Sequence, residues 1–217
     1  DMSLSKIIAD YDTKHLIIED TTTNFLTLVY FGNVFSENLE NILKISDVNI
    51  NQTFSQNLNI IPSDINLKFS YDIDIPIEIN NDAKFDSVYL KNGNILMNII
   101  SDYQHNGNIK ITIPNLINVN TGTPYTNTIP HIYTGTDINL QANINLNEYK
   151  LIFPVRNNKL KVNFEFSIDY KKANQTKPIN NIYFNASLSN IKYSKIYGCF
   201  GNISFPILED KFSIDIF

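Results

Sequence analysis

The stretch INLKFSYDIDIPIEI, residues 65–79, alternates strictly between apolar and polar side chains. An alternation with a period of two places every second side chain on the same side of a β-strand. We therefore predict a half-buried strand, which Pro76 either interrupts or confines to a sheet edge because proline has no N–H to donate. The apolar odd positions are Ile65, Leu67, Phe69, Tyr71, Ile73, Ile75, Ile77 and Ile79.

The same alternation recurs along the chain, in residues 138–146 and again in residues 160–170. Residues 15–31 are typical of a hairpin that turns near residues 20–24. An Asn106-Gly107 turn predicts a second hairpin, which joins a strand over 94–103 to one over 109–113. The polar stretches 118–130 and 171–181 are expected to be long loops.

Helical patterns are scarce. Ser36 is a suitable N-cap for a short helix that ends near Ile45, and a turn or two is expected between Leu4 and Tyr11. The fold predicted is all-β and mainly antiparallel, an elongated β-sandwich or curved sheet with one or two short helices. We expect residues 1–217 to form a single β-rich domain, and a chain that starts at Asp1 to be a processed form or a piece of a longer protein.

The charge of the chain disfavours nucleic acid as a partner. The formal net charge is −5, and the 17 Lys and Arg residues are scattered. The longest basic run, Lys171-Lys172, is too short to follow a phosphate backbone. No apolar run approaches the roughly 20 residues of a transmembrane helix, so no transmembrane segment is expected.

The single cysteine, Cys199, allows neither an intrachain disulfide nor a multi-cysteine metal site. It shares odd parity with Tyr193 and Tyr197, and later with Ile203 and Phe205, which is the spacing of one face of a strand. The pattern therefore predicts that Cys199 is a small buried residue in a core strand rather than a nucleophile.

Carboxylates on the polar face of the first stretch raise two chemical possibilities. Asp72, Asp74 and Glu78 could ligate calcium or act as a glycosidase pair. The stretch is extended and lacks the glycine of a calcium loop, so a solvated charged face is the better interpretation. No known catalytic motif is present, and we predict no enzymatic activity, no metal and no cofactor.

Segments of the C-terminal half resemble β-rich secreted and envelope proteins of Bacteroidota-type bacteria. The resemblance rests on residues 91–93, on the strand end at residues 113–116 and on the glycine-containing strand at residues 198–201, within KNGNILMNII, IPNL and IYGCFGNISF. It implies a protein secreted to the periplasm or cell surface and associated with the outer membrane, with a lipid anchor carried by a preceding segment. It transfers no catalytic residue.

The function predicted is a non-enzymatic cell-envelope protein that acts as a protein-interaction or scaffold subunit of an outer-membrane-associated assembly, with an envelope protein as its partner. Two alternatives stay open. One is a lipid-binding protein with an apolar tube or groove, for which the candidate lining residues are Phe69, Tyr71, Ile73, Ile75 and Ile77. The other is a carbohydrate-binding module, in which exposed aromatic rings would stack on sugars.

Overall fold

The computed structural model describes residues 15–19, 26–30, 43–79 and 82–201. Contacts divide the chain into two units, one of Asp1–Asn38 with Ser204–Phe217 and one of Leu39–Ile203. In the first unit, β1 (His15–Glu19) pairs antiparallel with β2 (Leu26–Tyr30), which confirms the predicted N-terminal hairpin. The prediction of one domain over residues 1–217 stays a prediction, and the rest of this description concerns the second unit.

The second unit consists of strands, and this confirms the all-β, antiparallel fold class. Hydrogen bonds join them into one nine-stranded sheet in the order β3-β11-β5-β9-β6-β10-β4, with β7 added to β6 and β8 added to β5. The strands are β3 (Val48–Asn57), β4 (Ile65–Pro76), β5 (Lys84–Ser101), β6 (Gly107–Asn118), β7 (Pro124–His131), β8 (Ile138–Asn145), β9 (Tyr149–Ile152), β10 (Lys159–Tyr170) and β11 (Ile179–Cys199).

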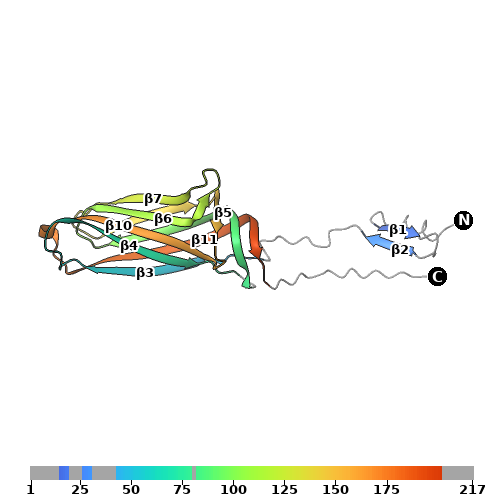
Figure 1. Ribbon diagram of the computed structural model, residues 1–217, viewed down its shortest axis with the longest axis horizontal. Helices are drawn as coiled ribbons and strands as arrows, with labels where there is room; N and C mark the ends of the chain where they lie inside the picture. The colour runs from blue at the N-terminus through green and yellow to red at the C-terminus, as the bar shows by residue number, and fades with distance from the viewer. Residues whose placement is uncertain (1–14, 20–25, 31–42, 80–81, 202–217) are drawn as a thin grey trace. The chain divides into compact units, whose positions relative to one another are not determined.

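This sheet folds over into two layers that pack face to face (Figure 1). One layer has the order β3-β11-β5-β8 and the other the order β4-β10-β6-β7. The short strand β9 pairs with β5 in one layer and with β6 in the other, so it links them at one corner. Eight long strands in two four-stranded antiparallel sheets, with this order, form a jelly roll.

The core lies between the two layers, because each strand sends alternate apolar side chains inward. In β10 the even-numbered residues from Leu160 to Tyr170 are all buried, as the alternation predicts. The ring of Phe164 meets the ring of Phe184 from β11 edge to face, with centroids 5.6 Å apart. Since β10 and β11 belong to different layers, this contact joins the two layers at the centre of the core.

Strand β4 follows the sequence prediction closely. It ends at Pro76 and pairs only with β10, so it is an edge strand. Beyond it, Ile79 forms an isolated bridge with Ile45, which closes the gap toward β3 at that end of the sandwich. The strand predicted at 138–146 is also present as β8.

Two of the predicted connections are wrong. Strands β5 and β6 do not pair with each other, although Asn106-Gly107 lies between them. The turn instead carries the chain from one layer to the other. Strand β5 pairs with β11 and β8 in the first layer, whereas β6 pairs with β10 and β7 in the second. The predicted loop over 118–130 contains strand β7, in which the inward positions Asn127 and His131 are polar, so no apolar alternation is visible.

The prediction that Cys199 is buried is wrong, because its side chain is exposed. Upstream, the buried residues of β11 are even-numbered, up to Leu188. The pairing with β5 then shifts register before Tyr193, which is buried, and again between Tyr193 and Lys195. After the second shift the even-numbered Ile196 and Phe200 pack against the core, and Cys199 faces outward. These bulges change which parity faces the core, so parity alone misplaces the residues that follow them.

Neither predicted helix is found among the residues that the structure describes, where helical geometry is limited to the 3-10 turn Lys172–Asn174 and to Asp82. Of the helix expected from Ser36 to Ile45, residues 43–45 are not helical and the others lie outside the described residues. The turn expected at residues 4–11 lies outside them as well.

We predict that Phe164→Ala lowers the free energy of unfolding by about 3–5 kcal/mol, because it removes a fully buried ring that joins the layers. Urea denaturation measures the change. Thr126→Ala, at an exposed position of β7, is the matched control and should change stability by less than about 0.5 kcal/mol. Similar losses for the two variants would contradict the placement of Phe164 at the centre of the core.

Candidate functional site

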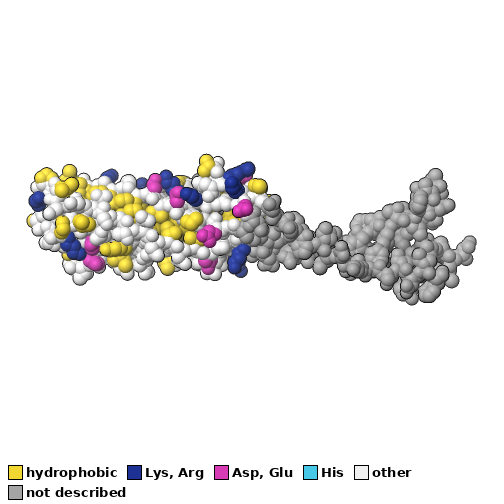
Figure 2. All heavy atoms as spheres, turned by 90° about the horizontal axis from the view of Figure 1, so that it is seen from below, with side chains coloured by type: hydrophobic (Ala, Val, Ile, Leu, Met, Phe, Trp, Pro, Cys, Tyr) yellow, Lys and Arg dark blue, Asp and Glu magenta, His cyan; other side chains and the backbone are white. Residues whose placement is uncertain are grey.

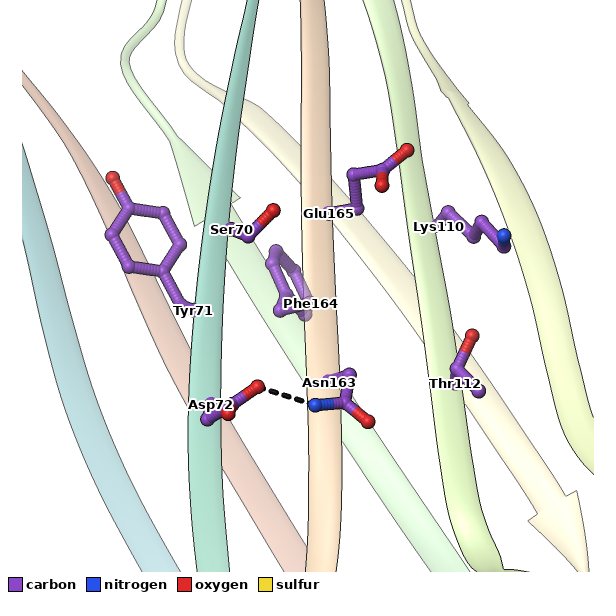
Figure 3. Close-up of a pocket in the computed structure, with 8 residues that line it drawn as sticks. All are labelled: Ser70, Tyr71, Asp72, Lys110, Thr112, Asn163, Phe164 and Glu165. Carbon is purple, nitrogen blue, oxygen red and sulfur yellow. Dashed lines mark hydrogen bonds between the residues drawn. The ribbon is translucent and has the colours of Figure 1, made fainter.

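The two outer faces of the sandwich differ in chemistry. On the layer β4-β10-β6-β7, charged side chains alternate in sign and pair across strands, so we call this surface the charged face. Lys161 lies 2.9 Å from Asp72, and Lys159 lies 3.2 Å from Asp74. This face holds a groove of about 200 Å³. Figure 3 shows its lining, in which polar side chains of three adjacent strands lie side by side.

The carboxylates of the charged face are unsuited to general acid catalysis. Asp72 accepts hydrogen bonds from Lys161 and from Asn163 (Figure 3), and these bonds, Lys161 first, lower its pKa. A general acid in a glycosidase needs a raised pKa and a desolvated position. Asp72 has neither, so the interpretation as a solvated, ion-paired face is favoured over a catalytic pair.

The outer face of the other layer, β3-β11-β5-β8, carries charged residues only toward one end, at Lys84, Asp86 and Lys91 of β5 and at Lys192 and Lys195 of β11. The rest of it carries no charged residue, and we call that part the amide face. It consists of the outward side chains of residues 49–55, 181–189, 94–100 and 139–145. These are Asn49, Asn51, Thr53 and Ser55 of β3; Asn181, Tyr183, Asn185, Ser187 and Ser189 of β11; Asn94, Leu96, Asn98 and Ile100 of β5; and Asn139, Gln141, Asn143 and Asn145 of β8.

A row of four amides crosses the centre of the amide face. Register places Asn185 opposite Asn51 on one side and opposite Asn98 on the other, and Asn98 opposite Gln141. Neighbouring strands lie about 4.8 Å apart, so the row spans roughly 15 Å. Asn51 and Gln141 at its two ends are exposed, and the central pair is half-buried.

The side-chain oxygen of Asn98, Oδ1, is buried and has no hydrogen-bond partner. A buried polar atom without a partner costs roughly 1–3 kcal/mol, and such atoms are rare in native proteins. Within the described part of the chain, the structure also records no side-chain hydrogen bond for Asn51, Asn185 or Gln141. The central row therefore has hydrogen-bonding capacity that the protein itself does not use.

Three larger side chains lie among these amides. Tyr183 and Leu96 are 41% and 44% exposed, and Ile100 lies opposite Tyr183. The Tyr183 ring is thus available at the surface, one row away from Asn185 and Asn98. Figure 2 shows one side of the same unit, on which uncharged atoms cover most of the surface and charged side chains form small separate groups.

A buried polar network occupies the end of the sandwich that we call the tip, formed by loops 58–64, 102–106, 132–137 and 171–178. His131 Nδ1 lies 2.9 Å from the carbonyl oxygen of His105, which can only accept, so Nδ1 carries the proton. Its Nε2, 2.8 Å from Ser101 Oγ, then accepts a hydrogen bond from that hydroxyl. Ser101 and His131 are both fully buried, so this Ser-His pair is closed to a substrate and holds loops together.

Of the five residues predicted to line a lipid tube, four lie on the inner side of β4, and Ile77 follows directly after the strand. Ile73, Ile75 and Ile77 are buried in the core, and Phe69 and Tyr71 are partly buried and pack against it. Tyr71 stacks on Phe54 of β3 with ring centroids 4.1 Å apart. They thus contribute to the packing between the layers, and lipid binding by this set stays a prediction.

Among the described residues there is no group of three His, Cys, Asp or Glu side chains placed to hold a metal ion. The same residues contain no helix long and apolar enough to span a membrane.

No protein-family model matches the chain, and no curated protein matches it. Solved structures with a similar arrangement include the empty capsid of Triatoma virus, at 8% identity and a TM-score of 0.33 over 75% of this chain and 76% of that one. A second is a structure of black queen cell virus, at 12% identity and a TM-score of 0.33 over 80% of this chain and 77% of that one. A third is a carbohydrate-binding module specific for non-crystalline cellulose, at 12% identity and a TM-score of 0.25 over 60% of this chain and 73% of that one. These identities and TM-scores tell nothing about function.

Sequence reasoning missed the amide face. Its residues come from four segments separated by tens of positions, and the chain is rich in asparagine throughout, so no local pattern marks them. The usable signal is that the polar positions of these four segments lack Lys, Asp and Glu, whereas those of β4 and β10 contain them. That contrast becomes informative only once the strands are known to be neighbours.

We predict that the free energy of unfolding falls as the pH is lowered from 6.5 to 4. Burial lowers the pKa of His131 from 6.5 to about 4, so the unfolded chain takes up a proton in this interval that the folded protein does not. The loss reaches about 3 kcal/mol. Urea denaturation across this pH interval measures the loss. The non-titrating variant His131→Gln should be less stable at neutral pH, and its free energy of unfolding should fall by less than that of the wild type over the same interval, because it lacks the contribution of His131. Equal slopes for the two proteins would contradict the assignment.

Proposed function

We propose that this protein is a non-enzymatic binding module whose amide face binds an uncharged polysaccharide. The observation that carries the proposal is the absence of charge on this face, while the opposite face of the same sandwich is charged and ion-paired. An uncharged face gains nothing from an anionic or cationic ligand, and its amides match a ligand rich in neutral hydroxyl groups.

The chemistry of amides supports this choice. Each Asn or Gln side chain offers an acceptor oxygen and two N–H donors, and each sugar hydroxyl can both donate and accept. The row Asn51, Asn185, Asn98 and Gln141 can therefore bond successive hydroxyls along an extended chain that lies across the strands. Because the terminal torsion of an asparagine is broad, a small rotation of Asn98 turns its unpaired oxygen toward such a hydroxyl.

Tyr183 supplies the apolar part of the site. A sugar ring has an apolar side that stacks on an aromatic ring, and the Tyr183 ring is exposed beside the row. Leu96 and Ile100 extend this apolar area. A protein partner fits the face less well, because the centres of protein interfaces are rich in aromatic residues, Met and Arg and poor in Ser.

The scaffold function predicted from the sequence is the second candidate, and the free edges of the same layer favour it. Secretion to the periplasm or cell surface, a lipid anchor and an envelope protein partner stay predictions that rest on the resemblance to envelope proteins.

The test is binding of the full chain to an array of neutral, uronic-acid and sulfated glycans, followed by calorimetry on the best ligand. We expect neutral glycans to bind best. Asn98→Ala and Tyr183→Ala should each weaken binding about 5- to 30-fold, which corresponds to about 1–2 kcal/mol. Asn98→Ala should not lower the melting temperature, because the side-chain oxygen that it removes has no partner in the free protein.

Thr126→Ala, on the outer face of the opposite layer, is the matched control and should bind like the wild type. Stronger binding to the charged glycans, or wild-type affinity in both amide-face variants, would refute the proposal.

A further inference from the structure

The free edges of the two layers are protected to very different degrees. An edge strand has unpaired N–H and C=O groups along one side, and proteins usually protect it with charged residues or proline. In the layer of the charged face, β4 carries Lys68, Asp72, Asp74 and Pro76, and β7 carries Pro124 and Pro130. Proline at an edge removes a donor from the free side of the strand.

The layer of the amide face has neither protection. Strand β3 (VNINQTFSQN) and strand β8 (INLQANIN) contain no charged residue and no proline. Each is paired on one side only, β3 with β11 and β8 with β5. Neither edge of this layer is thus protected by charge or proline against pairing with a further strand.

The β3 edge is open to solvent along its middle. Just before the first residue of β3, the Ile45–Ile79 bridge closes the gap between β3 and β4. Near the end of β3, the stack of Phe54 on Tyr71 closes the same gap. Between these two contacts lies an open groove, lined by residues 50–52 of β3 and 72–74 of β4.

The directions of the strands decide what fits beside these edges. In the order β3-β11-β5-β8 every pairing is antiparallel, so β3 and β8 run in opposite directions. A second copy that is displaced sideways without rotation therefore places its β3 antiparallel to β8 of the first copy. This is the favourable ladder, and the two strands have similar lengths, 10 and 8 residues.

The side chains also match across such a junction. On the outer side, Asn49 and Asn51 of one copy would continue the amides Gln141 and Asn143 of the next. On the inner side, Ile50 and Leu140 are only partly buried at the two edges, and the neighbouring copy would cover both. Polar side chains of β3 in one copy would thus lie beside polar side chains of β8 in the next, and apolar side chains beside apolar ones, as the register of a sheet requires.

We propose that copies of this chain associate head to tail, with β8 of one copy paired to β3 of the next, so that the amide faces join into one continuous sheet. Such a contact uses two different surfaces of each copy and does not close, so it builds a linear filament. This inference is independent of glycan binding, because the edges carry it and not the central row.

The test uses the full chain and three double variants at exposed positions. Asn139→Lys with Asn143→Lys protects the β8 edge, and Asn49→Lys with Thr53→Lys protects the β3 edge. Asn66→Lys with Thr126→Lys adds the same charge to β4 and β7 and is the control. Circular dichroism and the melting temperature establish that each variant is folded.

Sedimentation velocity should show a wild-type average mass that rises at least about twofold with concentration, and the control should behave in the same way. Each edge-protected variant alone should stay monomeric. Mixed in equal amounts, the two variants should form a species of two chains that grows no further, because each supplies the edge that the other lacks.

A wild type that stays monomeric would overturn the proposal. So would an edge-protected variant that still dimerises alone, since this would mean that like edges pair, and so would a control that no longer associates.

Discussion

The structure depends on the burial of alternate apolar side chains between two sheets. A strand with a period of two has one apolar side, and two such sheets must meet on those sides to remove them from water. The contact of Phe164 with Phe184 lies at the centre of this packing. Because the inner sides are buried in the core, the outer sides are free to differ. Here ion pairs cover one of them, and the amide face of the other carries no charge.

Inner and outer side chains therefore have different roles: the inner ones stabilise the fold, and the outer ones are available for binding. The buried inner side chains are mostly isoleucine, leucine, phenylalanine and valine in both layers. The outer side chains of β4 and β10 form ion pairs with one another, which are exposed and contribute little to stability. The outer side chains of β3, β11, β5 and β8 hold unused hydrogen-bonding groups instead, including the unpaired oxygen of Asn98.

The edges of the layers follow the same division. Charge and proline protect the edges of the charged layer, whereas the layer that carries the amide face ends on two uncharged strands of opposite direction. Glycan binding and filament formation use different parts of this layer, its central row and its edges. A filament would repeat the binding row many times along one surface, and such multivalency strengthens binding to a polymer without new contacts.

The sequence by itself determined the strands and their buried sides wherever the alternation was unbroken, as in residues 65–76 and 159–170, and it determined that Pro76 ends an edge strand. These features are local, because period and proline act within a single strand. Only the tertiary structure decided which strands are neighbours. It separated β5 from β6, shifted the register of β11 on both sides of Tyr193 and so exposed Cys199, and it brought Asn51, Asn98, Gln141 and Asn185 into one row. Pairing between strands is non-local, and a register that bulges can shift is not encoded in the spacing of any one segment.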